Sequence, residues 1–459
     1  MGGISPQARP HTEDAVNSND GFLQALVSGG DSRLVADPVT GLNRYLCPPT
    51  PARDLACLGS CTATPISAAG FEASRQCYLD VVETDSEAVA RASIARWYNR
   101  LRGALLAYFD TGDVADVELL PSGTDAVLLT AALLALEHGG RPVTAILPSA
   151  SETGTGVPRA AAGRGFDPGP SFDIPLPDVA VDTLEVALRT ADGASRGHDE
   201  LSVAFRHAAA SARARVVVYL THCSKTGLVA PIDVPPDVDV VVDACQMRIA
   251  PTVVRACLDK GWPVIVTGSK FLGGPPFSGA LLLPRGRFAS VRDKALRAFR
   301  MTAAGVAAAN DLAAQLGPLL RWIAALEVTP ALATIGADTP TVIGRLMRDA
   351  EDTLSQLPGV RIVPGPCQAM SNAGGWPSSI ITFAIPYPTD PTRFMTADEL
   401  RPLYQRLARL GVLIGQPIAL GRFGGLRVAL SAQDVVAGEV EGSLQRLTKA
   451  LSEVLKPIR

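Results

Sequence analysis

Between residues 114 and 284 the chain alternates short apolar runs with longer segments of helical periodicity. In chain order, five of the apolar runs are VADVELL, RPVTAILPS, RVVVYLTH, DVDVVVDAC and WPVIVTGS. A segment such as DAVLLTAALLALEHGG, closed by two glycines, is typical of a helix between two of these strands. Apolar strands separated by helices are characteristic of a parallel sheet covered on both faces. The sequence therefore predicts an α/β fold built on a large, mostly parallel sheet.

The segments that connect these strands differ in length and character. TLEVALRTA (183–191) and ELSVAFRHAAASA (200–212) are predicted as helices, with a surface loop at 192–201. The runs WPVIVTGS and SGALLLP flank Lys270, and too few residues separate them for a crossover helix. We therefore expect these last two strands to be antiparallel.

After about residue 315 the alternation gives way to mixed clusters of strands and helices. VRIVPG, SIITFAIP and LRVALS are predicted as strands, with helices near 308–328 and 340–357 and at TADELRPLYQRLARLG. Clusters of this kind fit a smaller α+β domain. We expect an N-terminal segment at 1–60, a large α/β domain at 61–315 and a small C-terminal α+β domain at 316–459.

Composition argues against several classes of function. The net charge is −3 and no basic patch carries interleaved aromatics, so nucleic-acid binding is not expected. The N-terminus MGGISPQARPHTEDAVNSND is polar and no apolar run reaches about 18 residues, so neither a signal peptide nor a membrane span is expected. Eight cysteines without CxxC pairs indicate reduced thiols in a cytoplasmic protein. The five histidines do not fall at zinc-ligand spacing, so no metal site is expected.

A candidate anion site follows the first strand, in LLPSGTDAVLL. Ser122, Gly123 and Thr124 form the turn from which a helix begins. The free N–H groups at a helix start, with two hydroxyls beside them, suit a phosphate group. Simple capping of the helix by Ser122, Thr124 or Asp125 is the alternative interpretation.

Two charged side chains stand at the ends of neighbouring apolar strands. Asp243 ends VVVDAC and is followed by Gln246, while Lys270 follows WPVIVTGS. Ligands of open α/β sheets bind at the carboxyl ends of the strands. A capping aspartate and a lysine that extends to water are the simpler interpretation of each residue alone. Together with a phosphate cup, however, they meet the requirements of pyridoxal 5′-phosphate.

The order of these motifs resembles that of the fold-type I pyridoxal-phosphate enzymes, nearest the class V aminotransferase and cysteine desulfurase branch. The resemblance covers about residues 60–455 and rests on PSGTDA, THCSKTGLVAPID, VDACQ, TGSK, FRMTAAG and LRVALS. It implies a sheet of the seven-stranded kind with helices on both faces, a smaller α+β domain, and pyridoxal 5′-phosphate as cofactor. The cofactor-binding residues that it implies are Ser122, Gly123, Thr124, Ser224, Asp243, Gln246, Thr267, Ser269, Lys270 and Thr302.

The resemblance also implies a role for particular residues. Lys270 is expected to hold the cofactor as a covalent imine, and Asp243 to contact its pyridine nitrogen; these two are the expected catalytic residues. Arg427 is expected to bind the substrate carboxylate, for which its guanidinium fork is suited. Thr302 is expected to reach the phosphate of the partner subunit, which implies a homodimer.

The chain also departs from the family pattern. Ser269, and not a histidine, precedes Lys270, and the segment expected to stack on the pyridine ring has no aromatic residue. Glu152 and Thr153 are the candidates to cover the ring. The stretch VLIGQPIALGRFGG, where a desulfurase carries its nucleophilic thiol, has no cysteine, and Cys367 lies much earlier. Persulfide chemistry is therefore not expected.

The predicted function is that of an aminotransferase-like enzyme that binds an amino-acid substrate at Lys270. A lyase, or an enzyme that forms carbon–carbon or carbon–heteroatom bonds, is the alternative within the same chemistry. A sensor that binds the cofactor or an amino acid without catalysis is the alternative of another class. The N-terminal residues Arg44 and Tyr45 are candidates to border the site, because this region borders the substrate in relatives.

Overall fold

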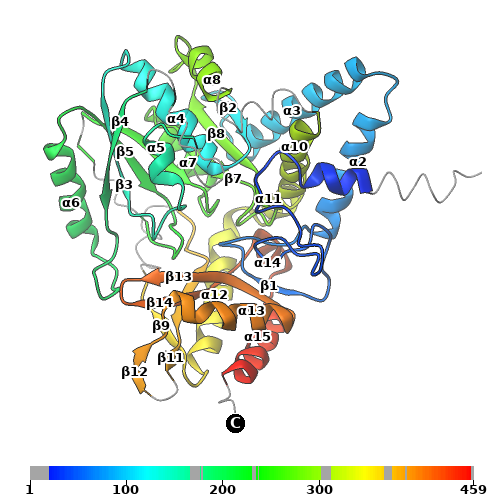
Figure 1. Ribbon diagram of the computed structural model, residues 1–459, viewed down its shortest axis with the longest axis vertical. Coiled ribbons are helices and arrows are strands. Elements are labelled where there is room, and N and C mark those ends of the chain that lie inside the picture. Colours follow the sequence, from blue (N-terminus) through cyan, green and yellow to red (C-terminus); the bar gives the residue numbers. More distant parts are fainter. Residues whose placement is uncertain are drawn as a thin grey trace, which may run out of the picture.

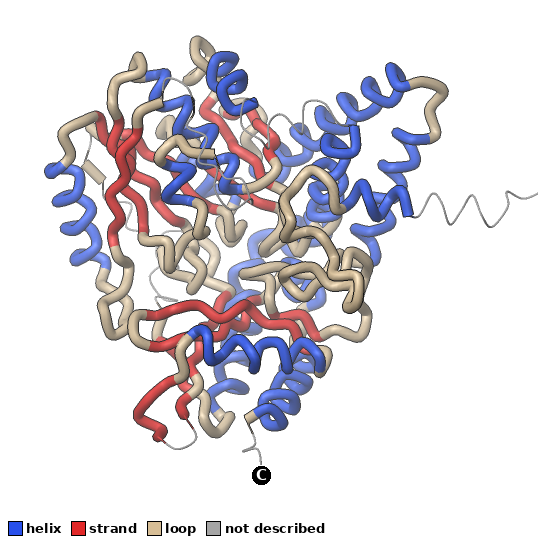
Figure 2. The backbone as a smooth tube through the Cα atoms, in the orientation of Figure 1, coloured by secondary structure: helices blue, strands red, loops and turns tan. Residues whose placement is uncertain are grey.

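The computed structural model describes residues 20–165, 176, 179–229, 234–235, 237–300, 312–365, 375–387 and 390–455. Thr302 and Cys367 lie outside these residues. Two sheets organise the described part of the chain, a large one in the upper half of Figure 1 and a smaller one below it. Helices cover both, as the tube in Figure 2 shows.

The large sheet has seven strands in the order β2-β8-β7-β6-β5-β3-β4. Their bounds are β2 Ala115–Leu120, β3 Val143–Pro148, β4 Val181–Val186, β5 Arg215–Thr221, β6 Asp239–Ala244, β7 Val264–Thr267 and β8 Gly279–Pro284. The pairs β4–β3, β3–β5, β5–β6 and β6–β7 are parallel. Strand β8 is antiparallel to both of its neighbours, β2 and β7. The predicted mostly parallel sheet is confirmed, as is the antiparallel pair on either side of Lys270.

Helices cover both faces of this sheet. They are α3 Glu87–Phe109, α4 Gly123–Glu137, α5 Val157–Ala161, α6 His198–Ser211, α7 Pro251–Asp259 and α8 Arg292–Arg300. Along β6, Val240 and Val242 join the core on one face, while Val241 joins the core on the other. Because alternate residues of a strand point to opposite faces, both faces of the strand are buried. This explains the apolar runs in the central strands of the sheet.

One predicted element is wrong. Residues 183–191 are predicted as a helix, but the structure places 183–186 in strand β4, which pairs in parallel with β3, and 187–191 outside any helix. From Val181 to Leu184 its residues alternate between half-buried and exposed, as expected of an edge strand with one face in solvent. Val181, Thr183 and Val186 favour strands, and pairing with β3 outweighs the short helical spacing of apolar residues. The predicted helix at 200–212 is confirmed as α6.

The small sheet has five strands in the order β1-β13-β14-β10-β9. They are β1 Ala56–Leu58, β9 Arg361–Val363, β10 Ile380–Ala384, β13 Val412–Leu420 and β14 Phe423–Ala429. A two-stranded ribbon, β11 Pro386–Tyr387 with β12 Asp390–Phe394, extends beside it. Helices α12 Thr339–Ser355, α13 Ala397–Arg409, α14 Ala432–Ala437 and α15 Glu441–Val454 pack here. Because β1 pairs with β13, the end of the N-terminal segment adds a strand to the small sheet.

Helix α10, Leu312–Leu326, packs against α2, Ala68–Val82, and against α3. Within Ala314–Ser355, one 18-residue window has a mean hydropathy of 1.3, which is apolar enough to resemble a membrane span. In the structure it is divided into α10, α11 (Thr329–Ile335), a 3₁₀ turn (Gly336–Asp338) and α12. Leu319, Leu320 and Trp322 are fully buried in the core. Core packing therefore accounts for the apolar character of α10.

Candidate active site

A cavity of about 570 Å³ lies at the carboxyl ends of β5, β6 and β7, with residues of β13 and β14 on its other side. This volume is within the range typical of small-molecule sites. Residues predicted for the site that line it are Ser122, Gly123, Thr124, Ser224, Asp243, Gln246, Thr267, Ser269, Lys270 and Arg427. The remaining predicted residue, Thr302, lies outside the described part of the chain.

The first turn of α4 forms one wall of the cavity. Ser122 caps the helix, since its Oγ accepts from the Asp125 N–H at 3.2 Å and donates to the Asp125 carboxylate at 2.7 Å. A Cβ atom on Gly123 would lie 2.5 Å from Cys245 Sγ and 3.0 Å from Thr267 Cγ2. Glycine therefore lets the helix start lie directly against the ends of β6 and β7. The N–H groups of a first helical turn have no backbone partner inside the helix, so those other than the Asp125 N–H, which Ser122 caps, remain for an anion.

Asp243 is the buried carboxylate of the site. It occupies the fifth position of β6, with 6% of its surface exposed. Burial raises its pKa, while a hydrogen bond from the Cys245 N–H to Oδ1, 3.1 Å long, lowers it. Among the described residues no cation forms an ion pair with this carboxylate. A buried carboxylate of this kind needs a cationic or hydrogen-bonding partner from a ligand.

Lys270 follows β7 and reaches across the cavity to Thr62, in the stretch that follows β1. Its Nζ donates a hydrogen bond to the backbone carbonyl of Thr62. Burial lowers the pKa of the Lys270 amine to about 8, because charge is disfavoured away from water. A substantial fraction of this amine is therefore neutral near physiological pH, the form that attacks an aldehyde.

Arg427, on β14, is buried with 3% of its surface exposed. Its guanidinium donates to the carbonyls of Gln416 and Lys225, at 2.7 and 3.0 Å, and to Thr62 Oγ1 at 3.0 Å. All of these acceptors are neutral. In the part of the chain that the structure describes, no carboxylate lies within ion-pair distance of Arg427. The side chain therefore presents an uncompensated positive charge to the cavity.

Gln246 is fixed by an arginine that the sequence analysis did not select. Arg248 donates to Gln246 Oε1 at 2.8 Å, and Gln246 Nε2 donates to the Cys61 carbonyl at 3.2 Å. Arg248 also donates to Ser60 Oγ at 2.6 Å and to Ser379 Oγ at 2.7 Å. This buried cation thus joins the end of β6 to the N-terminal segment and to the small sheet. Its one sequence signal was a charge inside the apolar stretch MRIAP.

Ser224 takes part in a buried network with Glu152. Ser224 Oγ donates to the Glu152 carboxylate at 2.6 Å, and Arg189 pairs with the same carboxylate at 2.7 Å. Thr226 Oγ1 also donates to Glu152, at 2.8 Å. The Glu152 carboxylate is therefore occupied within the protein.

Two threonine hydroxyls in the cavity wall have no hydrogen-bond partner among the residues that the structure describes. Thr153 Oγ1 and Thr221 Oγ1 are buried and unpaired, and both residues line the cavity. Unpaired buried hydroxyls are costly unless a ligand or water meets them. Arg44 and Tyr45 line the same cavity, as do Cys61 and Thr62. The N-terminal segment therefore contributes to the wall of the site.

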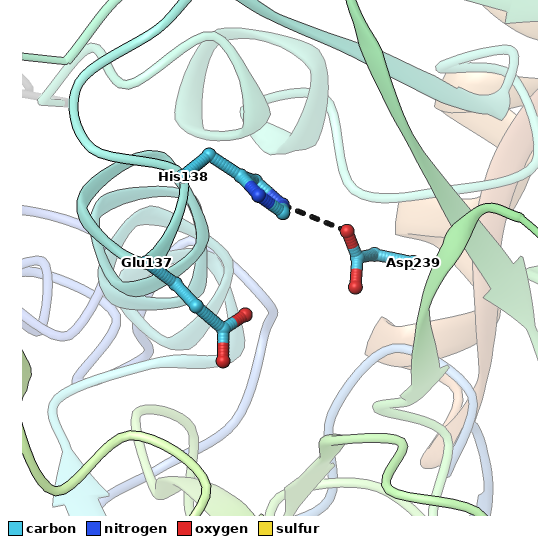
Figure 3. Close-up of side chains that lie close together, drawn as sticks. All are labelled: Glu137, His138 and Asp239. Carbon is cyan, nitrogen blue, oxygen red and sulfur yellow. Dashed lines mark hydrogen bonds and ion pairs between the residues drawn. The ribbon is translucent and has the colours of Figure 1, made fainter.

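A second polar cluster lies at the opposite end of β6. Figure 3 shows Glu137 and His138 at the end of α4, with His138 pointing towards Asp239. His138 Nε2 lies 2.8 Å from Asp239, and Arg287 pairs with Glu137 at 2.9 Å and with Asp239 at 2.7 Å. Although burial raises the pKa of Asp239, the partners Arg287, His138 and Arg215 lower it below its usual value. Arginines neutralise these carboxylates, so the cluster is an ion-pair network and not a metal centre.

No family model matches this chain, and no curated protein is similar to it in sequence. Several solved structures share its fold. The cysteine desulfurase CsdA from Escherichia coli is 16% identical, with a TM-score of 0.54 over 88% of this chain and 96% of that chain. The cystine C–S lyase C-DES is 16% identical, with a TM-score of 0.56 over 87% and 98% of the two chains. A sphingosine-1-phosphate lyase from Burkholderia pseudomallei is 14% identical, with a TM-score of 0.52 over 99% and 93%. The chain thus shares the fold of these structures, as its motifs indicated.

Proposed function

We propose that this protein is a pyridoxal-phosphate-dependent enzyme that acts on the amine of an amino acid. One observation carries the proposal: ten residues selected from separate sequence motifs line a single cavity. Among them are a buried amine with a lowered pKa, Lys270, and a buried carboxylate, Asp243. Asp243 lies near the end of β6, and Lys270 comes shortly after the end of β7, which is parallel to β6. The fold, which is that of known pyridoxal-phosphate enzymes, supports the same cofactor.

The residues of the cavity fit the parts of this cofactor. The first turn of α4, from Gly123, would bind the phosphate through its N–H groups. Asp243, which lacks a cationic partner among the described residues, would hold a proton on the pyridine nitrogen. The unpaired hydroxyls of Thr153 and Thr221 are available to polar groups of the same ligand. When bound, the cofactor supplies an aldehyde that joins to amines and a ring that withdraws electrons from the substrate Cα.

Lys270 and Arg427 would then have different roles, proton transfer for Lys270 and substrate binding for Arg427. Lys270 would hold the cofactor, and its amine, when free, would carry a proton to or from the substrate. An amine whose pKa is about 8 can both accept and release a proton near neutral pH. Arg427 orients the substrate through its α-carboxylate, which replaces the neutral carbonyl partners of the guanidinium.

We place transamination first among the reactions, with elimination as the second candidate. The similarity in fold to a cystine C–S lyase and to a second lyase favours this second candidate. Persulfide transfer is not proposed. The stretch expected to carry its thiol is largely strand β13, Val412–Leu420, which has no cysteine. We further propose a cytoplasmic homodimer, in which Thr302 reaches the partner's phosphate site; sedimentation of the purified protein tests the dimer.

The reaction can be identified from the fate of the cofactor. The protein is loaded with pyridoxal phosphate and mixed with a panel of amino acids. A transaminase converts the cofactor to its pyridoxamine form, and a lyase releases keto acid while the cofactor is unchanged. A protein that gave a reversible spectral change with every amine but no product would be a sensor, contrary to the proposal. The Lys270→Ala variant is the control for reactions that need no protein amine.

A further inference from the structure

Lys225, which the proposed function leaves unused, lies in the wall of the same cavity. It follows β5 on a turn in which Cys223 and Gly227 have φ values of +64° and +87°. The Lys225 N–H donates to the Glu152 carbonyl at 2.8 Å, and the Lys225 carbonyl accepts from Arg427 at 3.0 Å. Its backbone is therefore fixed on both sides, between the loop after β3 and strand β14.

The Lys225 side chain is held as firmly as its backbone. Nζ donates to the carbonyl of Ala150 at 2.8 Å, in the loop that also carries Glu152. An ammonium group has three donors, and this contact uses one of them. Burial lowers the pKa of Lys225 to about 8; the nearby Arg427 lowers it and Glu152 raises it. The other two N–H donors of Lys225 thus belong to a partly desolvated ammonium group, which lies near the guanidinium of Arg427.

Two of the carboxylates that line the cavity, Glu152 and Asp31, are paired with arginines, and Asp243 is assigned to the cofactor by the proposed function. Glu152 is bound by Arg189 at 2.7 Å and by the hydroxyls of Ser224 and Thr226. Asp31, which also lines the cavity, pairs with Arg33 at 2.6 Å. Among the described residues no carboxylate forms an ion pair with Lys225 or Arg427, the two cations that share this wall.

Two adjacent cations in one cavity favour a ligand with two anionic groups. The substrate α-carboxylate, which the proposed function assigns to Arg427, accounts for one of them. Lys225 would remain without an anion if the substrate side chain were neutral. A compact ammonium group binds carboxylate, sulfonate or phosphate oxygens alike as a point charge.

We propose that the substrate is an amino acid whose side chain ends in a second acidic group, which Lys225 binds. This inference rests on the proposed function, because it assumes that Arg427 binds the α-carboxylate and that the substrate amine reacts at the cofactor. It adds the class of substrate, an acidic amino acid, and a specificity-determining residue.

The test compares acidic amino acids with their neutral counterparts on the holoenzyme. L-Aspartate and L-asparagine, L-glutamate and L-glutamine, and L-cysteate, whose acidic group is a sulfonate, are titrated while the cofactor absorbance is followed. The wild-type protein should bind at least one acidic member about 10- to 100-fold more tightly than its neutral counterpart. L-Cysteate is compared with L-asparagine. Equal affinities across every comparison would overturn the inference.

Variants then test whether Lys225 causes the preference for acidic amino acids. Lys225→Gln should remove the preference for the acidic member and leave the affinity for the neutral member unchanged, and Lys225→Arg should restore part of it. Lys260→Gln, at an exposed lysine that lies over Trp262, is the matched control and should behave as wild type. A preference that persists in Lys225→Gln would assign it to another residue and overturn the inference.

Failure of this inference is distinguishable from failure of the proposed function. If the cofactor attaches at Lys270 and amino acids displace it without any acidic preference, only the substrate class is wrong. If no cofactor attaches at Lys270, the proposed function is wrong, and the inference falls with it. Should Lys225→Gln fail to retain the cofactor, the wild-type ratios and Lys225→Arg still decide the outcome.

Discussion

Arg427 Nη2 donates to Thr62 Oγ1 across 3.0 Å, although the two residues are 365 positions apart in the chain. The carbonyl of the same threonine accepts from Lys270 Nζ, and its hydroxyl also accepts from the Gln416 N–H at 3.1 Å. Thr62 therefore contacts both the lysine proposed to hold the cofactor and the arginine proposed to bind the substrate. The stretch after β1 that carries Thr62 thereby positions the two groups relative to each other.

Thr62→Val tests this positioning role. Valine keeps the shape and the backbone carbonyl but removes the hydroxyl that orients Arg427. We expect KM for the amino acid to rise roughly 2- to 10-fold, the value of one hydrogen bond, with kcat and cofactor content unchanged. The control is Thr334→Val, at an exposed threonine outside the site. An unchanged KM would show that Arg427 is oriented without Thr62.

Gly123→Ala tests the phosphate cup. A methyl group there would lie 2.5 Å from Cys245 Sγ and 3.0 Å from Thr267 Cγ2, so the helix start must move away from the strand ends. We expect cofactor affinity to fall at least about tenfold and the protein to lose about 1–3 kcal/mol of stability. Gly103→Ala on α3, where no atom lies within 4 Å of the added Cβ, should leave both intact. Equal cofactor affinity in the two variants would contradict the assignment.

Asp243→Asn tests the role of the buried carboxylate. The amide keeps the size of the side chain but cannot hold a proton on the pyridine nitrogen as a charged partner. We expect kcat to fall roughly 100-fold or more, as when a preorganised electrostatic partner is removed, while covalent attachment at Lys270 persists. The two effects are measured by steady-state kinetics and by reductive trapping. A variant with wild-type kcat would remove Asp243 from the chemistry.

The lowered pKa of Lys270 predicts how cofactor capture depends on pH. Burial disfavours the charged ammonium, so the neutral, reactive fraction should rise about tenfold per pH unit until about pH 8 and then level off. The measurement is the rate at which the cofactor-free protein forms the covalent adduct, followed by absorbance. A rate that continued to rise towards the ordinary lysine pKa of 10.5 would show that burial does not tune this amine.

Much of the fold could be predicted because its strands are marked locally. Apolar strands such as β5 and β6 stand out from the helices between them, and the turn at Ser122 is marked by a glycine and hydroxyl residues. Strand β4 was missed because an edge strand is only partly buried and its pairing with β3 is not visible locally. Strand β13 was missed because Gly415, Gln416 and Pro417 interrupt its apolar pattern.

Only some of the site residues could be predicted from the sequence, for a related reason. Asp243 and Lys270 are conspicuous as charges at the ends of apolar strands. Arg248 and Lys225 carry equal charges, but what they do depends on partners far away in the chain, such as Ser379 for Arg248. Periodicity does not reveal contacts of this kind, so only the folded chain shows that Lys225 shares a cavity wall with Arg427.

The most direct test of the account is to trap the cofactor on the protein. Purified protein is mixed with pyridoxal 5′-phosphate, reduced with borohydride, digested and analysed by mass spectrometry. The account predicts a phosphopyridoxyl adduct on Lys270 that is absent from Lys270→Ala. No adduct, or an adduct confined to another lysine such as Lys225, would contradict it.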